Sequence, residues 1–249
     1  MDTPDYLYKY QRLTAHSLAS VINETVWLAK PSTFNDPFDC ALTLSSDLFE
    51  ESMRHAISDI SERMAKQGIS TEGLNRIRPE DRQRYEELRK ALLSISERIG
   101  VFSLSAIRDH MLMWSHYAAQ HHGLCVEYDC REGTDLRKHA NPVQYVTDIP
   151  PLSLADVHGP NKHRFLEVAL FTKAQHWEYE QEWRVVMPEG NRVYAAPSPI
   201  TSIMFGARMP MEEKVMVYLA LKNKAGISFK EAYLADDKFA IEFRPFSLE

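Results

Sequence analysis

Three glutamates alternate with aromatic residues in the segment 177–184, WEYEQEWR. In a β-strand, successive side chains point to opposite faces, so Glu178, Glu180 and Glu182 would share one face with Arg184. Like charges about 7 Å apart repel each other, and water, Arg184, a bound cation or a hydroxyl-rich ligand must offset the repulsion. A solvated sheet face, or the last turn of a helix, is the simpler interpretation.

Two chemistries suit Glu180 and Glu182. Their carboxylates can accept hydrogen bonds from ribose hydroxyls and stabilise an oxocarbenium ion during glycosyl transfer. They can also hold Mg²⁺ together with Asp36 for phosphodiester hydrolysis. On the opposite strand face, Trp177 and Tyr179 can flank a planar ligand or pack into the core.

Other common catalytic motifs are absent. Four histidines, His110, His116, His121 and His122, fall in or at the end of a helix predicted for 107–122, but no HExxH pair occurs. No nearby cysteine or carboxylate completes a tetrahedral set, so we predict no zinc site and assign no metal ligand there. The chain has no GxGxxG, GK[ST] or GxSxG motif, and its nine glycines leave little room for a glycine-cradled nucleotide.

The composition narrows the class of partner. The 249 residues carry a net charge of -6, which disfavours nucleic acid and anionic membranes as partners. Three cysteines without a CxxC pair indicate reduced thiols. No signal peptide and no apolar run of about 20 residues is present, so we expect a cytoplasmic protein with no membrane partner.

Strand-like and helix-like segments alternate irregularly, without the regular spacing of a doubly wound sheet. The predicted strands cover 6–10, 25–29, 101–105, 124–129, 142–146, 177–186, 200–206, 232–234 and 240–243. The predicted helices cover 13–23, 47–66, 79–99, 107–122, 164–176 and 212–223. Between the two prolines of 31–39, Asn35 and Asp36 indicate a structured loop. We predict a single α+β domain over 1–249, with a mixed or mainly antiparallel sheet, whole or split, and a helical insertion at about 46–100.

Several motifs occur in an order that resembles a known family. They are YKY at 8–10, FNDPFD at 34–39, FS at 102–103, MWSHYA at 113–118, HGLCV at 122–126, and Lys173 followed by the 177–184 segment. Together they are similar to the bacterial domain-of-unknown-function family 2971. The resemblance covers nearly the whole chain.

The resemblance implies a link to the ADP-ribosyltransferase-like fold. Family members often begin with a His-Tyr pair and later carry a Glu-x-Glu on a strand, similar to the NAD-contacting and catalytic motifs of those enzymes. Here Lys9 stands in place of that histidine; lysine can donate to a ribose hydroxyl or diphosphate but is not a near-neutral imidazole. The family's settings also imply a role in phage defence.

We therefore expect an ADP-ribosyltransferase-like or NAD-consuming enzyme, with NAD as substrate and a nucleotide-like small molecule as partner. Glu182 is the expected catalytic carboxylate and Glu180 its orienting partner. The expected cofactor-binding residues are Tyr8, Lys9, Tyr10, Asn35, His116, Tyr117, Trp177 and Arg184.

Two alternatives stay open. In a metal-dependent nuclease, Asp36, Glu180 and Glu182 would be ligands, with Lys173 or Arg184 near the scissile phosphate; the acidic net charge weighs against it. In a non-catalytic binding or sensing module, Glu182 and Arg184 would form a structural ion pair. Removing Glu182 would then unfold the domain.

Overall fold

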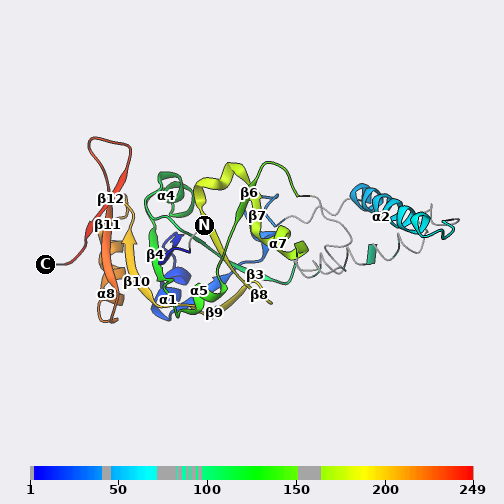
Figure 1. Cartoon of the computed structure of the whole chain (residues 1–249). Helices are drawn as coiled ribbons and strands as arrows, with labels where there is room; N and C mark the ends of the chain where they lie inside the picture. The colour runs from blue at the N-terminus through cyan, green and yellow to red at the C-terminus, as the bar shows by residue number, and fades with distance from the viewer. Residues whose placement is uncertain are drawn as a thin grey trace.

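The computed structural model describes residues 3–40, 46–71, 97–150 and 164–248, with isolated positions between 83 and 94. The strands of its large sheet are β1 (Tyr6–Gln11), β3 (Gly100–Ser105), β4 (Leu124–Asp129), β5 (Asn141–Pro142), β8 (Glu182–Met187), β10 (Ile200–Phe205), β11 (Ser228–Leu234) and β12 (Ile241–Pro245). Two small sheets pair β2 (Thr25–Leu28) with β9 (Arg192–Ala195), and β6 (Gln144–Val146) with β7 (Thr172–Ala174). Figure 1 shows the large sheet running through the body of the molecule.

The large sheet is mixed but mainly antiparallel. Its strand order, within the described residues, is β12-β11-β10-β4-β1-β3-β8-β5. β10 and β11 run parallel, and the other neighbouring pairs run antiparallel. Parallel strands need a crossover, which α8 (Met211–Leu221) provides. The predicted α+β class is confirmed.

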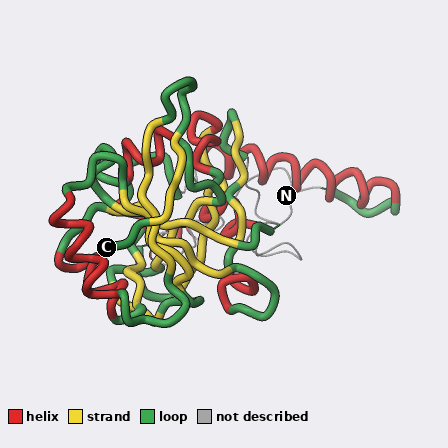
Figure 2. The backbone as a smooth tube through the Cα atoms, turned by 90° about the vertical axis from the view of Figure 1, so that its left-hand side faces the viewer, coloured by secondary structure: helices red, strands yellow, loops and turns green. Residues whose placement is uncertain are grey.

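The remaining described helices are α1 (Ala15–Ile22), α2 (Ser46–Lys66), α4 (Met111–Tyr117), α5 (Asp135–His139) and α7 (Arg164–Phe171), with 3₁₀ helices η1 (Pro31–Thr33) and η2 (Gln175–Glu180). In both views α2 lies away from the sheet (Figures 1 and 2). The helix predicted for 79–99 falls mostly outside the described residues. None of the described helices is both long and apolar enough to cross a membrane.

The central strand β4 is buried on both faces. Leu124, Val126 and Tyr128 join a core cluster with α1, α5, α8 and the β2–β9 sheet. Cys125 faces the other way, into a cluster with Trp114 of α4, which is fully buried. Side chains that alternate along one strand therefore attach covering elements to both faces of the sheet.

Two predicted helices are longer than the real ones. The helix predicted for 107–122 spans only Met111–Tyr117, because Ala119, Gln120 and His121 all adopt positive φ angles between 49° and 70°. Left-handed residues cannot continue a right-handed helix. The helix predicted for 164–176 ends at Phe171, where β7 begins.

Gly123 joins the turn after α4 to β4. A Cβ at this position would lie 2.3 Å from the Gln11 carbonyl oxygen and 2.9 Å from that of Ala118. At Gly206, which packs on the same turn, a Cβ would lie 2.1 Å from the His121 carbonyl oxygen. We expect Gly123→Ala and Gly206→Ala each to lower the free energy of unfolding by about 1–3 kcal/mol in urea denaturation. Unchanged midpoints would contradict this close packing.

Candidate functional site

The segment 177–184 is not the continuous strand that its pattern predicts. η2 ends at Glu180, Gln181 adopts a left-handed conformation with φ 43°, and β8 begins at Glu182. The prediction that Glu180 and Glu182 share one face of a strand is therefore wrong, since Glu180 lies before the strand and Gln181 is not extended. The turn at Gln181 nevertheless directs both carboxylates toward the same ammonium group.

That ammonium group belongs to Lys173, at the centre of a buried ionic network. Its Nζ lies 2.5 Å from Glu180 Oε2, 3.0 Å from Glu182 Oε2 and 3.3 Å from Asp39 Oδ2. Arg184 donates from Nε to Glu182 Oε1 at 2.8 Å, and from Nη2 to both Asp39 carboxylate oxygens at 2.8 and 2.7 Å. None of these five residues is more than 8% exposed. Three carboxylates against two cations give the network a net charge of -1.

Segments far apart in the chain build this network. Asp39 comes from the loop after η1, Lys173 from β7 and Glu180 from the end of η2. Glu182 and Arg184 are two residues apart on β8, so their side chains leave the same face. Arg184 also donates to the Leu170 carbonyl oxygen at 2.8 Å, which ties the network to α7.

The network shifts the pKa values of its two glutamates in opposite directions. Burial alone would raise the pKa of Glu182, but the charge and hydrogen bonds of Arg184, with help from Lys173, lower it to about 2. Burial raises the pKa of Glu180 above its ordinary value, and Lys173 and Tyr117 offset only part of that effect. Glu182 is therefore a fixed anion, and Glu180 is the more easily protonated carboxylate.

Tyr117 and its neighbours approach Glu180 from α4. The Tyr117 hydroxyl donates to Glu180 Oε1 at 2.5 Å. His116 Nδ1 lies 3.1 Å from the Tyr179 hydroxyl. Ser105 Oγ donates to the Glu180 backbone oxygen at 2.6 Å and holds the end of η2 in place.

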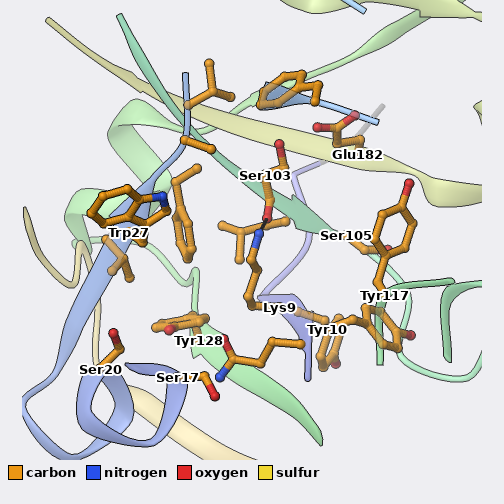
Figure 3. A pocket seen from close by; sticks show the side chains of 18 of the residues that line it. Lys9, Tyr10, Ser17, Ser20, Trp27, Ser103, Ser105, Tyr117, Tyr128 and Glu182 are labelled. Carbon is orange, nitrogen blue, oxygen red and sulfur yellow. Dashed lines mark hydrogen bonds between the residues drawn. The ribbon is translucent and has the colours of Figure 1, made fainter. Parts of the chain in front are cut away.

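A cavity of about 1230 Å³ lies beside the network (Figure 3). Eight of the ten predicted site residues line it: Tyr8, Lys9, Tyr10, Asn35, His116, Tyr117, Glu180 and Glu182. Known ligand pockets measure roughly 300–1,000 Å³, so the cavity has enough volume for a dinucleotide. The structure thus brings most of the predicted residues to one cavity.

Two predicted ligand-binding residues lie outside that lining. Arg184 is fully buried behind the carboxylates, where it binds Glu182 and Asp39. The ring of Trp177 lies 5.1 Å from Lys173 Nζ, a cation–π distance. Both residues support the network and are not among those that line the cavity.

Lys9 lies in the middle of the view of the cavity (Figure 3). Its Nζ donates to the Ser103 carbonyl oxygen at 2.9 Å and lies 5.2 Å from the centre of the Phe102 ring. Burial lowers the pKa of Lys9, while the charges of Glu182 and Glu180 oppose that shift. In its protonated form the side chain suits an anionic group.

The ligand set predicted for a nuclease is not assembled. Asp36 Oδ1 accepts a hydrogen bond from the Phe38 backbone N–H at 2.9 Å within its own loop. In the part of the chain that the structure describes, no three His, Cys, Asp or Glu side chains are grouped to hold a metal ion. Lys173 occupies the centre among the buried carboxylates instead.

Sequence reasoning missed several residues of the site. The motif 34–39 contains Asp39 but assigns it no role, whereas in the structure Asp39 binds Arg184. The Tyr145 hydroxyl accepts a hydrogen bond from the Glu182 backbone N–H at 2.7 Å. Ser17 and Trp27 line the cavity from α1 and β2. The one signal in the sequence is an acidic residue at the end of the loop 31–39 with its two prolines.

One comparison with known proteins gives a match. A family model described as "Protein of unknown function (DUF2971)" matches residues 113–185. This region runs from α4 to β8 and carries the network apart from Asp39, so the match supports the family resemblance over that region. The searches of curated proteins and of solved structures found no match.

Glu182 makes the stability of the fold depend on pH. Its pKa is about 2 in the folded protein against an ordinary value of 4.5, so its stabilising effect is present above pH 4.5 and is lost as the pH falls toward 2. We expect the difference in unfolding free energy between wild type and Glu182→Gln to shrink by about 3 kcal/mol between pH 6 and pH 2. Glu180, whose raised pKa has the opposite effect, is present in both proteins. Urea titrations at each pH measure this, and a constant difference would contradict it.

Proposed function

We propose that the protein binds NAD in the cavity and cleaves the bond between nicotinamide and ribose. The observation that carries this proposal is the gathering of eight predicted site residues, two of them buried carboxylates, around one cavity of dinucleotide size. Buried ionisable groups with shifted pKa values at a cavity wall are typical of functional sites. The family match is consistent with this proposal and assigns no activity.

The reaction needs a negative charge close to the ribose. As the glycosidic C–N bond breaks, its electron pair leaves with nicotinamide and positive charge develops on the anomeric carbon. A carboxylate beside that carbon stabilises the charge, and a water molecule or another nucleophile then adds there and loses a proton. With water, the products are nicotinamide, ADP-ribose and a proton.

The hydrogen bonds favour Glu180 over Glu182 as the reacting carboxylate. Both oxygens of Glu182 are bound to buried cations: Oε1 to Arg184, and Oε2 to Arg184 and Lys173. Glu180 instead binds Tyr117, a neutral phenol that lines the cavity, and shares Lys173. We assign the reacting role to Glu180 and the positioning role to Glu182, the reverse of the assignment from sequence.

Lys9 would hold the diphosphate. An ammonium group carries three N–H donors, so Lys9 can bind a phosphate oxygen in addition to the Ser103 carbonyl. Lys9 lines the cavity, and its protonated form opposes the net negative charge of the network. The ligand's own two negative charges therefore meet a cation near the middle of the cavity.

The test is incubation of the purified protein with millimolar NAD, with nicotinamide measured by chromatography. Nicotinamide release with a raised melting temperature supports the proposal, because a ligand that binds only the folded state stabilises it. If NAD causes no nicotinamide release and no change in melting temperature, the proposal is wrong.

A non-catalytic binding module is the second candidate function. The observation that favours it is the ionic pairing of Glu182 and Arg184, with Arg184 wholly buried. In such a module the ionic network only holds the surrounding segments in place and takes no part in a reaction. Under this function, NAD or a related nucleotide raises the melting temperature and stays intact.

We extend the first proposal to a cytoplasmic bacterial enzyme that acts in phage defence. Its three cysteines are free and buried in the fold, which suits a reducing compartment. Phage plating on cells that express wild type or Glu180→Gln tests this role. Equal plaque numbers on the two would contradict it.

A further inference from the structure

Two half-exposed apolar side chains form part of the cavity lining. Trp27 on β2 and Val193 on β9 are 51% and 53% exposed, and both line the cavity. They pair directly across the two strands. Directly opposed residues on antiparallel strands have Cβ atoms about 4.5–5.5 Å apart, so the two side chains form one continuous apolar surface.

The strand pattern explains why these side chains are outside the core. On β2, the neighbours Val26 and Leu28 are buried in the main core cluster, and alternation leaves Trp27 on the other side. The core is thus complete without Trp27. A large aromatic side chain left exposed beside a cavity is available to a ligand.

We propose that Trp27, supported by Val193, is the stacking surface for the adenine base of the bound nucleotide. This inference rests on the proposed function and adds the orientation of the ligand. Figure 3 shows Trp27 on one side of the cavity, Tyr117 and Glu182 on the other, and Lys9 between them. Adenine, diphosphate and nicotinamide ribose follow one another along NAD in the same order.

Charge and polarity agree with this orientation. A purine base is planar and uncharged, and stacking on an aromatic ring does not require a charged partner. The Trp27 end of the cavity offers apolar surface together with the hydroxyls of Ser17 and Ser20 on α1. The carboxylates at the opposite end suit the ribose whose glycosidic bond breaks.

The test separates the two ends of the ligand. Binding of AMP, nicotinamide mononucleotide and NAD is measured by calorimetry on wild type, Trp27→Ala and Trp27→Phe. Loss of base stacking weakens binding by about 5- to 150-fold. We expect Trp27→Ala to weaken AMP and NAD binding by this factor and to leave nicotinamide mononucleotide unchanged, while Trp27→Phe keeps most of the affinity. Leu219→Ala, at a half-exposed position on α8, is the control.

The outcomes distinguish this inference from the proposed function. AMP and NAD binding that is unchanged in Trp27→Ala, with nicotinamide release intact, would overturn the stacking role and leave the activity standing. AMP binding that depends on Trp27, without any cleavage of NAD, would support the stacking role and reject the reaction. If wild type binds neither AMP nor NAD, both proposals are wrong.

Discussion

Arg184→Met should lower the free energy of unfolding by about 3–5 kcal/mol or more, the largest stability effect we expect from one substitution. Arg184 is fully buried and donates to Glu182, Asp39 and the Leu170 carbonyl oxygen. Methionine fills similar space but leaves three buried carboxylates with Lys173 as their one cation in the network. Because folded domains are stable by only about 5–15 kcal/mol, the fraction of unfolded molecules should rise at 37 °C.

Two controls show whether the lost charge is the cause. Arg192→Ala removes another arginine–carboxylate pair, but its pair with Glu189 is about 62% exposed on both sides, so we expect a loss below about 1 kcal/mol. Asp39→Asn in the Arg184→Met background removes one of the three carboxylates that then share Lys173 as their cation, and should recover part of the stability. Urea denaturation at pH 7 measures all four proteins. Equal losses for the Arg184 and Arg192 variants would reject the buried network as the source of stability.

Much of the fold was predictable because its strands carry their own signals. The sequences of β4 and β10 are rich in apolar and β-branched residues. The predicted ends of both strands lie within a residue or two of the ends in the structure. β9 was missed, because all but one of its residues are exposed and it is a strand through pairing with β2, far away in the chain. Nothing in Ala119-Gln120-His121 signals three left-handed residues, so the helix over α4 was predicted too long.

The site was predictable as a set of residues but not as a geometry. Residue types and order identified eight residues that line one cavity. The pairing of Arg184 with Asp39 joins positions 145 residues apart, and no local pattern encodes such a contact. The left-handed conformation of Gln181 also interrupts the strand that the sequence predicts. The roles of Glu180 and Glu182 therefore follow from their hydrogen-bond partners, which only the structure shows.

Glu180→Gln should lower the rate of nicotinamide release by at least about 10²–10³-fold, the usual effect of removing one electrostatic group from a reacting centre. The substitution keeps the shape of the side chain and removes its charge. Lys173 keeps Glu182 and Asp39 as partners, so the variant should remain folded, with a loss of about 1–3 kcal/mol. Nicotinamide release, NAD binding by calorimetry and urea denaturation are measured on the same preparation.

Glu182→Gln and Tyr117→Phe are the matched variants for this prediction. Glu182→Gln removes the anion that Arg184 binds, so we expect it to cost more stability than Glu180→Gln. Tyr117→Phe removes the hydrogen bond to Glu180 Oε1 and should slow release by a smaller factor while NAD still binds. Full activity in Glu180→Gln, with loss of activity in a folded Glu182→Gln, would return the reacting role to Glu182. Full activity in both would reject Glu180 and Glu182 as the reacting carboxylate and would leave Asp39, the other buried carboxylate that lines the cavity among the described residues.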